Sequence, residues 1–160
     1  MNTALVFIKP HAVNEKVVGL AKDFLNSKGC SVVREGMLSA EAIGQRGIID
    51  DHYAALAANA VKLKPKELLV GDKNKAAFKD AFGKDWDASA SDGTSVLNLA
   101  DFRARWPDMS VREIEARWRA GKTVKLAPGT YVSLLEEEKV MVVNGFYGSM
   151  REKFVAPGTS

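Results

Sequence analysis

The sequence predicts an α/β fold, and the order of its first three segments carries this prediction. Residues 3–9 form an apolar run that ends before a proline, which is typical of a strand buried on both faces. Residues 14–29 combine an N-capping asparagine, apolar side chains at helical spacing and a final glycine. Residues 30–38 follow as a second predicted strand. Strand, helix and strand in this order favour layered α/β packing.

The middle of the chain has a different character, with many lysines between residues 62 and 84. Phe78, Phe82 and Trp86 recur every four residues, which predicts the buried stripe of a short helix. Ser110 and Glu113 predict a capping box at the start of another helix. The further elements that we expect are helices over residues 96–106, 111–120 and 146–154, and strands over residues 123–126, 130–135 and 139–143.

Composition excludes several classes of protein. The chain has 23 basic and 20 acidic side chains, and this balance is too even to indicate nucleic acid as a partner. Its single cysteine, Cys30, excludes an internal disulfide framework, and we expect it to be a buried thiol. The apolar run near the N-terminus is far shorter than the roughly 20 residues of a membrane span. These features predict a soluble, cytoplasmic protein.

Three short motifs resemble one known family. The stretch Ala4-Leu5-Val6-Phe7-Ile8-Lys9-Pro10-His11-Ala12-Val13 is similar to the opening strand of nucleoside diphosphate kinases, which ends in Lys-Pro-Asp followed by Gly or Ala and Val. His52-Tyr53-Ala54-Ala55-Leu56 resembles the family's His-Tyr helix. Phe146-Tyr147-Gly148-Ser149-Met150 resembles the aromatic pair that opens the family's next helix. The last two motifs are close together in the family, whereas residues 57–145 separate them here.

The resemblance implies a fold and a division of the chain. It implies a partial ferredoxin-like sheet in which residues 1–56 are the first part of a kinase-like domain. Residues 57–145 would be an inserted lobe of helices and a β-hairpin, and residues 146–160 would resume the kinase-like domain. The three tryptophans of the predicted insertion indicate a core of its own. The missing strands would leave an apolar edge, so we expect a longer chain or a second polypeptide to complete the sheet.

The resemblance also implies an activity, which is transfer of the terminal phosphate of a nucleoside triphosphate to a nucleoside diphosphate through a phosphohistidine. The expected partners are these nucleotides, with Mg²⁺ carried on their phosphates, and further copies of the same chain. Residues 1–160 contain no Asn-x-x-His-Gly-Ser motif, which would supply the nucleophile. His11 stands where the family has Asp, and His52 matches a position without a catalytic role. We therefore predict no catalytic residue in this chain and expect it to be inactive alone.

Lys9, Tyr53 and Phe146 are the predicted nucleotide-binding residues. A lysine at the carboxyl end of a buried strand faces the edge at which α/β sheets bind ligands, and its ammonium group can contact a phosphate. The resemblance places Tyr53 near that phosphate and Phe146 against the base. Each residue also has an ordinary structural interpretation. Lys9 would carry its strand end into water, Tyr53 would pack in the core, and Phe146 would be the first buried position of a helix.

Two other functions compete with the kinase interpretation. The first is a noncatalytic nucleotide-binding or scaffold protein on the same fold. The second is nucleic-acid binding, because residues 96–143 follow the order of a winged helix and Arg112, Arg117 and Arg119 lie on its second helix. Glutamates alternate with these arginines, and residues 136–138 place three more at the tip of the wing, which argues against nucleic acid. No cluster of side chains has the spacing of metal ligands.

Overall fold

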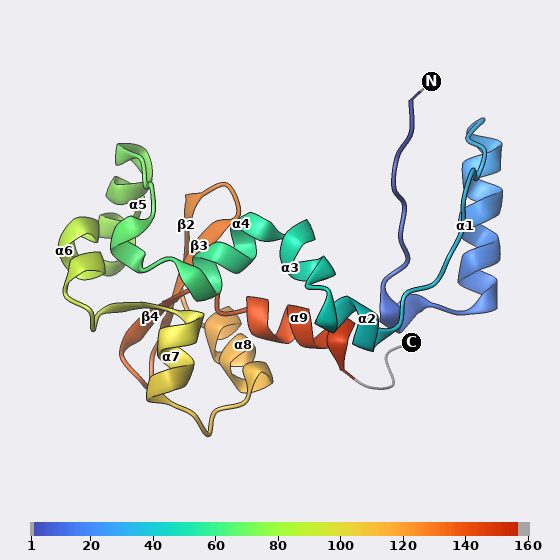
Figure 1. Cartoon of the computed structure of the whole chain (residues 1–160). Coiled ribbons are helices and arrows are strands. Elements are labelled where there is room, and N and C mark those ends of the chain that lie inside the picture. The colour runs from blue at the N-terminus through green and yellow to red at the C-terminus, as the bar shows by residue number, and fades with distance from the viewer. Residues whose placement is uncertain (1, 157–160) are drawn as a thin grey trace. The chain divides into compact units, whose positions relative to one another are not determined.

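A four-stranded mixed sheet lies at the centre of the region from Asp50 to Arg151 (Figure 1). Its strands are β1 (Val96–Asn98), β2 (Thr123–Ala127), β3 (Thr130–Leu135) and β4 (Val140–Val143). They are ordered β1-β4-β3-β2. The last three form antiparallel pairs, and β1 pairs with β4 in parallel, with Leu97 opposite Val142. The three strands predicted from residues 123–143 are therefore confirmed, as is the α/β class.

The structure is a computed structural model that describes residues 2–156, and these residues form two units. The second unit is Asp50–Arg151, and the first unit consists of residues 2–49 and 152–156. The predicted insertion, residues 57–145, falls within the second unit. Helices of the second unit, apart from α3 and α9 at its ends, are α4 (Ala54–Ala57), η2 (Ala58–Lys62), η3 (Pro65–Glu67), α5 (Asp72–Phe82), α6 (Trp86–Ser91), α7 (Leu99–Arg105) and α8 (Val111–Ala120).

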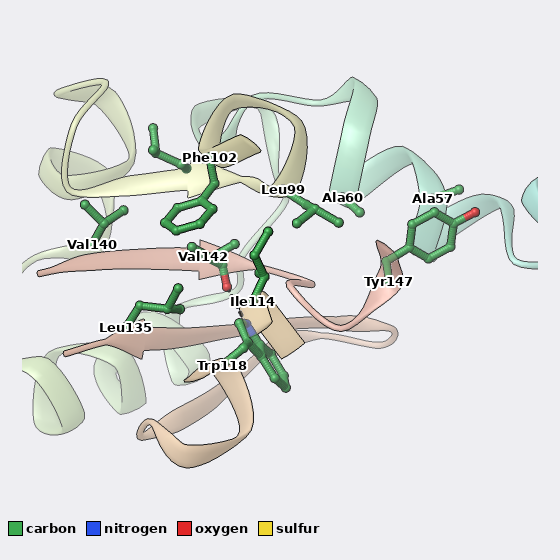
Figure 2. Close-up of a cluster of buried hydrophobic side chains, with 11 residues drawn as sticks. Ala57, Ala60, Leu99, Phe102, Ile114, Trp118, Leu135, Val140, Val142 and Tyr147 are labelled. Atoms are coloured by element: carbon green, nitrogen blue, oxygen red, sulfur yellow. Dashed lines mark hydrogen bonds between the residues drawn. The ribbon is translucent and has the colours of Figure 1, made fainter. Parts of the chain in front are cut away.

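Helices cover both faces of the sheet. Successive side chains of a strand point to opposite faces, so one strand can contribute apolar residues to both. On one face, Val140 and Val142 of β4 pack in a cluster with residues of η2, α7, α8 and α9 (Tyr147–Val155), and Figure 2 shows this cluster. On the other face, Met141 and Val143 pack with residues of α5 and α6. The second unit thus has three layers, with helices on either side of the sheet.

Local sequence signals set the helix ends in the second unit. The Ser110 hydroxyl accepts a hydrogen bond from the Glu113 amide (3.2 Å), and the Glu113 carboxylate accepts one from the Ser110 amide (2.9 Å), which confirms the predicted capping box. The predicted helix over residues 96–106 begins later, because Val96–Asn98 pairs as β1 and the Asn98 side chain then caps α7. The predicted stripe of Phe78, Phe82 and Trp86 spans two helices, because Gly83 has a left-handed backbone and ends α5.

The first unit differs from the prediction. Its elements are η1 (Pro10–Ala12), α1 (Glu15–Ser27), α2 (Ala40–Gln45) and the start of α3 (Ile48–His52). Asn14 caps α1 as predicted. Residues 3–9 and 30–38, the two predicted strands, form no β-ladder with any described residue. A strand needs a partner for its backbone N–H and C=O groups, and residues 2–156 supply none to these segments.

Large apolar side chains in both segments are exposed. Leu5 is 81% exposed, although it belongs to the segment that was predicted to be a buried strand, and Val33 in the second predicted strand is 82% exposed. Cys30 is also exposed, so the prediction of a buried thiol is wrong. Among residues 2–156, no helix has both the length and the apolar character needed to cross a membrane.

Candidate functional site

Lys9 belongs to the first unit and precedes a short turn. Pro10 opens the 3-10 helix η1, and Lys9 is its N-cap residue, with its carbonyl accepting a hydrogen bond from the Ala12 amide (2.9 Å). A proline restricts the residue before it to extended conformations, and the backbone of Lys9 is extended. Its side chain is exposed. The predicted position of Lys9, at the carboxyl end of a buried strand, is therefore wrong for the structure described here.

Tyr53 belongs to the second unit, where it precedes α4. Its carbonyl accepts a hydrogen bond from the Ala57 amide (2.9 Å), which starts that helix. Its side chain is half-buried and packs against the hydrophobic cluster of Figure 2. The ring of His52 meets it edge-on, with ring centroids 4.7 Å apart. Tyr53 therefore has the environment of a residue at the edge of a core.

Phe146 lies in the link between β4 and α9, and its ring is engaged by two other aromatic rings. The ring centroid of Trp118 is 5.2 Å away and that of Tyr131 is 6.5 Å away, both at steep angles. Phe146 is half-buried and packs against the same cluster as Tyr53. The structure thus brings Tyr53 and Phe146 to one cluster of the second unit, while Lys9 belongs to the first.

The sequence did not single out Asp50 and Arg151, yet with Tyr147 they form an extensive polar contact. The Asp50 carboxylate accepts a hydrogen bond from the Tyr147 hydroxyl, and Arg151 Nε donates to Oδ1 (2.8 Å) and Oδ2 (3.0 Å). Burial alone would raise the pKa of Asp50, but the bonds from Arg151 and Tyr147 outweigh it and lower that pKa. Burial and the neighbouring carboxylate raise the pKa of Tyr147. No short motif could reveal this contact, because its members are far apart in the sequence.

Asn144 is a second buried polar residue that shapes the same region. Its side-chain oxygen accepts from the Tyr131 amide (3.0 Å), and its Nδ2 donates to the carbonyls of Leu56 (3.3 Å) and Gly129 (3.0 Å). Its backbone is left-handed, a conformation that asparagine tolerates better than most residues. Asn144 therefore ties three chain segments together where β4 turns toward α9. The Asn-Gly pair in the sequence was a signal for this turn.

Arg117 and Arg119 of α8 are engaged by carboxylates. Arg117 bonds to Glu137 and Glu138 in the turn between β3 and β4, and Arg119 bonds to Glu115 (2.7 Å). A basic surface for nucleic acid needs cations that are free to meet phosphates. At Arg117 and Arg119 the structure shows intramolecular ion pairs instead.

None of the three predicted nucleotide-binding residues lines either of two open hollows. One, of about 500 Å³, is lined by α1 and residues 31–35, and the other, of about 350 Å³, is lined by residues 68–71, Lys75 and Asp87. In the described part of the chain, no group of three or more His, Cys, Asp or Glu side chains gathers to hold a metal ion.

Comparisons with protein-family models, with curated proteins and with solved structures found no match to this chain. The comparisons therefore add no support to the resemblance to nucleoside diphosphate kinases, which was found in the three sequence motifs.

Proposed function

We propose that this chain belongs to a nucleoside diphosphate kinase-like protein and contributes nucleotide contacts to it. In this proposal, Lys9 contacts phosphate, Tyr53 lies near it, and Phe146 supports the base. The nucleotide brings its own Mg²⁺. The phosphate-accepting histidine belongs to a motif that residues 1–160 do not contain.

One observation carries the proposal, which is the arrangement of the first 38 residues. An apolar run leads to Lys9 and Pro10, a capped helix follows, and a second extended apolar segment comes next. Large apolar side chains on all three segments are exposed: Leu5, Val6, Leu20, Phe24, Val32, Val33, Met37 and Leu38. A ferredoxin-like sheet would pair both extended segments with further strands and cover these side chains. We therefore expect the first unit to be one part of such a sheet.

The second unit contains the predicted insertion, residues 57–145, and two of its features support the proposal that this insertion is a lobe of its own. The unit has one hydrophobic cluster on each face of its own sheet. Its first and last residues, Asp50 and Arg151, are hydrogen-bonded to each other. A module whose two ends lie close together can be inserted into a loop of another domain without separating the flanking residues.

Phosphohistidine formation is the direct test of catalysis. The natural gene product is incubated with terminally labelled ATP and Mg²⁺, and acid-labile, base-stable label is then mapped. Label on a histidine of the Asn-x-x-His-Gly-Ser motif supports the kinase proposal. Label on His11 or His52 would overturn our assignment of roles, and absence of label and of phosphate exchange would leave the noncatalytic nucleotide-binding protein.

Binding is tested separately, by titrating Mg²⁺–ADP into the chain of residues 1–160 and following its NMR resonances. Stacking on one aromatic ring contributes about 1–3 kcal/mol, and one exposed charge contact adds about 0–1 kcal/mol. The dissociation constant expected from about 4 kcal/mol is near the millimolar range. Lys9→Gln should weaken binding, whereas Lys16→Gln, which removes the same charge from the exposed surface of α1, should not. Equal effects would remove Lys9 from the site.

A further inference from the structure

The contact among Asp50, Tyr147 and Arg151 joins two chain segments at the ends of the second unit. Asp50 lies on α3, and Tyr147 and Arg151 lie one turn apart on α9. Arg151 and Tyr147 approach the carboxylate together, so its two oxygens accept three hydrogen bonds. Charge-assisted bonds of this kind are stronger and more directional than neutral ones. We refer to these three residues as the clamp.

The three residues of the clamp differ in how far they are buried. Tyr147 is only 2% exposed, and its ring packs in the cluster of Figure 2, near Ala57. A buried tyrosine hydroxyl needs a hydrogen-bond partner, and Asp50 supplies the acceptor. The side chain of Asp50 is 33% exposed and that of Arg151 is 37% exposed, so water reaches the ion pair from one side. Losing the carboxylate would leave the hydroxyl without its acceptor and the guanidinium without its partner.

The clamp is adjacent to both aromatic residues of the proposed nucleotide site that lie in the second unit. Phe146 immediately precedes Tyr147, and Tyr53 follows Asp50 by less than one helical turn. On the other side of Phe146, the Asn144 side chain is hydrogen-bonded to the backbones of Leu56, Gly129 and Tyr131. The backbone at Phe146 is therefore held on both sides, by Asn144 and by the clamp.

We propose that the clamp positions Phe146 and Tyr53 and that nucleotide affinity depends on it. Asp50, Tyr147 and Arg151 are positioning residues in this scheme, since they act through the two aromatic side chains. The part that concerns nucleotide rests on the proposed function. The part that concerns the position of Phe146 stands on the geometry of the second unit alone.

The experiment uses the chain of residues 1–160 and two readouts. The first is the NMR resonance of the Trp118 indole N–H, which donates to the Val142 carbonyl (2.7 Å) while its ring contacts Phe146. Movement of Phe146 changes the ring current at Trp118 and shifts this resonance. The second readout is the affinity for Mg²⁺–ADP. A role confined to stability would lower the unfolding midpoint and leave both readouts of the folded protein unchanged.

Three variants make the test specific. Asp50→Ala removes the whole clamp, and Tyr147→Phe removes only the hydroxyl while retaining the ring, so that it folds even where Asp50→Ala does not. Asp51→Ala is the matched control, because it removes an exposed carboxylate from the same helix. We expect Asp50→Ala and Tyr147→Phe to shift the Trp118 resonance. Asp50→Ala should also weaken ADP binding by about tenfold, since small misplacements of contacting groups are costly. Asp51→Ala should change neither readout.

A Trp118 resonance that stays at the wild-type position in both clamp variants would overturn the proposal. So would a shift of equal size in Asp51→Ala. If the wild-type chain does not bind ADP, the nucleotide assignment fails. The Trp118 resonance then decides about the clamp by itself, because a shift supports it and no shift overturns it.

Discussion

The two units of this chain differ in how far their large apolar side chains are buried. In the second unit, apolar residues on both faces of the sheet are covered by helices, and Phe78, Phe102 and Ile114 are fully buried. In the first unit, Leu20 and Phe24 of α1 are more than half exposed, as are apolar residues in both extended segments. An apolar pattern thus indicates which side chains would be stabilised by burial. Cover itself requires further elements, and residues 2–156 provide none for these side chains of α1 and the two extended segments.

The largest expected contrast is between two phenylalanines. Phe102→Ala removes a ring that is 0% exposed, and we expect it to lower the free energy of unfolding by about 3–5 kcal/mol. Phe24→Ala removes a ring that is 61% exposed, and the expected change is within about 0.5 kcal/mol. Urea unfolding followed by far-UV circular dichroism reports on both units. A large loss of stability in Phe24→Ala would show that this ring is covered in solution, and the contrast between the units would fail.

Replacing one of two glycines by alanine should change stability in opposite directions, one in each unit. A methyl group at Gly145 would lie 2.4 Å from Trp118 Cδ1, so Gly145→Ala must displace a buried ring and should cost about 1–3 kcal/mol. A methyl group at Gly19 would meet nothing within 4 Å. Because Gly19 is inside α1, Gly19→Ala should stabilise that helix by about 0.5–1 kcal/mol. The same urea experiment checks both variants. Destabilisation by Gly19→Ala would indicate that this face of α1 is packed against a partner.

Removing a helix cap should have a smaller effect on stability, and one that differs between the two units. Ser110→Ala removes the cap of α8, whose residues Ile114 and Trp118 are buried, so it should lower the stability of the whole second unit by about 1 kcal/mol. Asn14→Ala removes the cap of α1, which has no buried residue, so the loss should remain local to that helix. Tryptophan fluorescence measures the second unit, because Trp86, Trp106 and Trp118 all lie there. Amide hydrogen exchange measures α1. A lower fluorescence midpoint in Asn14→Ala would contradict the separation of the two units.

Sequence reasoning succeeded where local signals decide the structure. The strands between residues 123 and 143, the cap at Asn14 and the capping box at Ser110 follow from alternation and from side-chain chemistry within a few residues. It failed for residues 3–9 and 30–38, because an apolar run predicts burial but not the presence of a pairing strand. It also missed β1, since three residues that pair with a distant strand resemble the start of a helix.

In the candidate site, too, local motifs predicted some residues, whereas a contact between distant residues was missed. Tyr53 and Phe146 were chosen from short motifs, and the structure places both against one cluster. The clamp could not be found in this way, because Asp50 and Arg151 are separated by 101 positions and neither belongs to a motif. Such a contact depends on the return of the chain through the sheet to α9. Residue spacing carries no information about it, and the joint position of Lys9 and Tyr53 stays a prediction for the same reason.

The smallest expected effect is the pH-dependent contribution of Asp92, in the loop before β1, to the stability of the second unit. Asp92 accepts hydrogen bonds from the Thr94 amide (2.7 Å), the Thr94 hydroxyl (3.1 Å) and the Ser95 amide (2.7 Å). Burial would raise the pKa of Asp92, but the bonds from Ser95 and Thr94 outweigh it and lower the pKa from 3.8 to about 2. The carboxylate therefore stabilises the folded state fully above its unfolded pKa, near pH 4. That contribution is lost as the pH falls toward 2.

Asp92 is exposed, so solvent screening should reduce its contribution to less than about 1 kcal/mol. We expect Asp92→Ala to lower the urea midpoint of the second unit at pH 6, and the difference from wild type should shrink when both are measured at pH 3. Asp23→Ala removes a carboxylate from the exposed surface of α1 and is the matched control for charge. Tryptophan fluorescence should register the Asp92 change and not the Asp23 change, because the tryptophans report on the second unit. If the difference between wild type and Asp92→Ala instead grows as the pH falls, the carboxylate does not stabilise the loop in its ionised form.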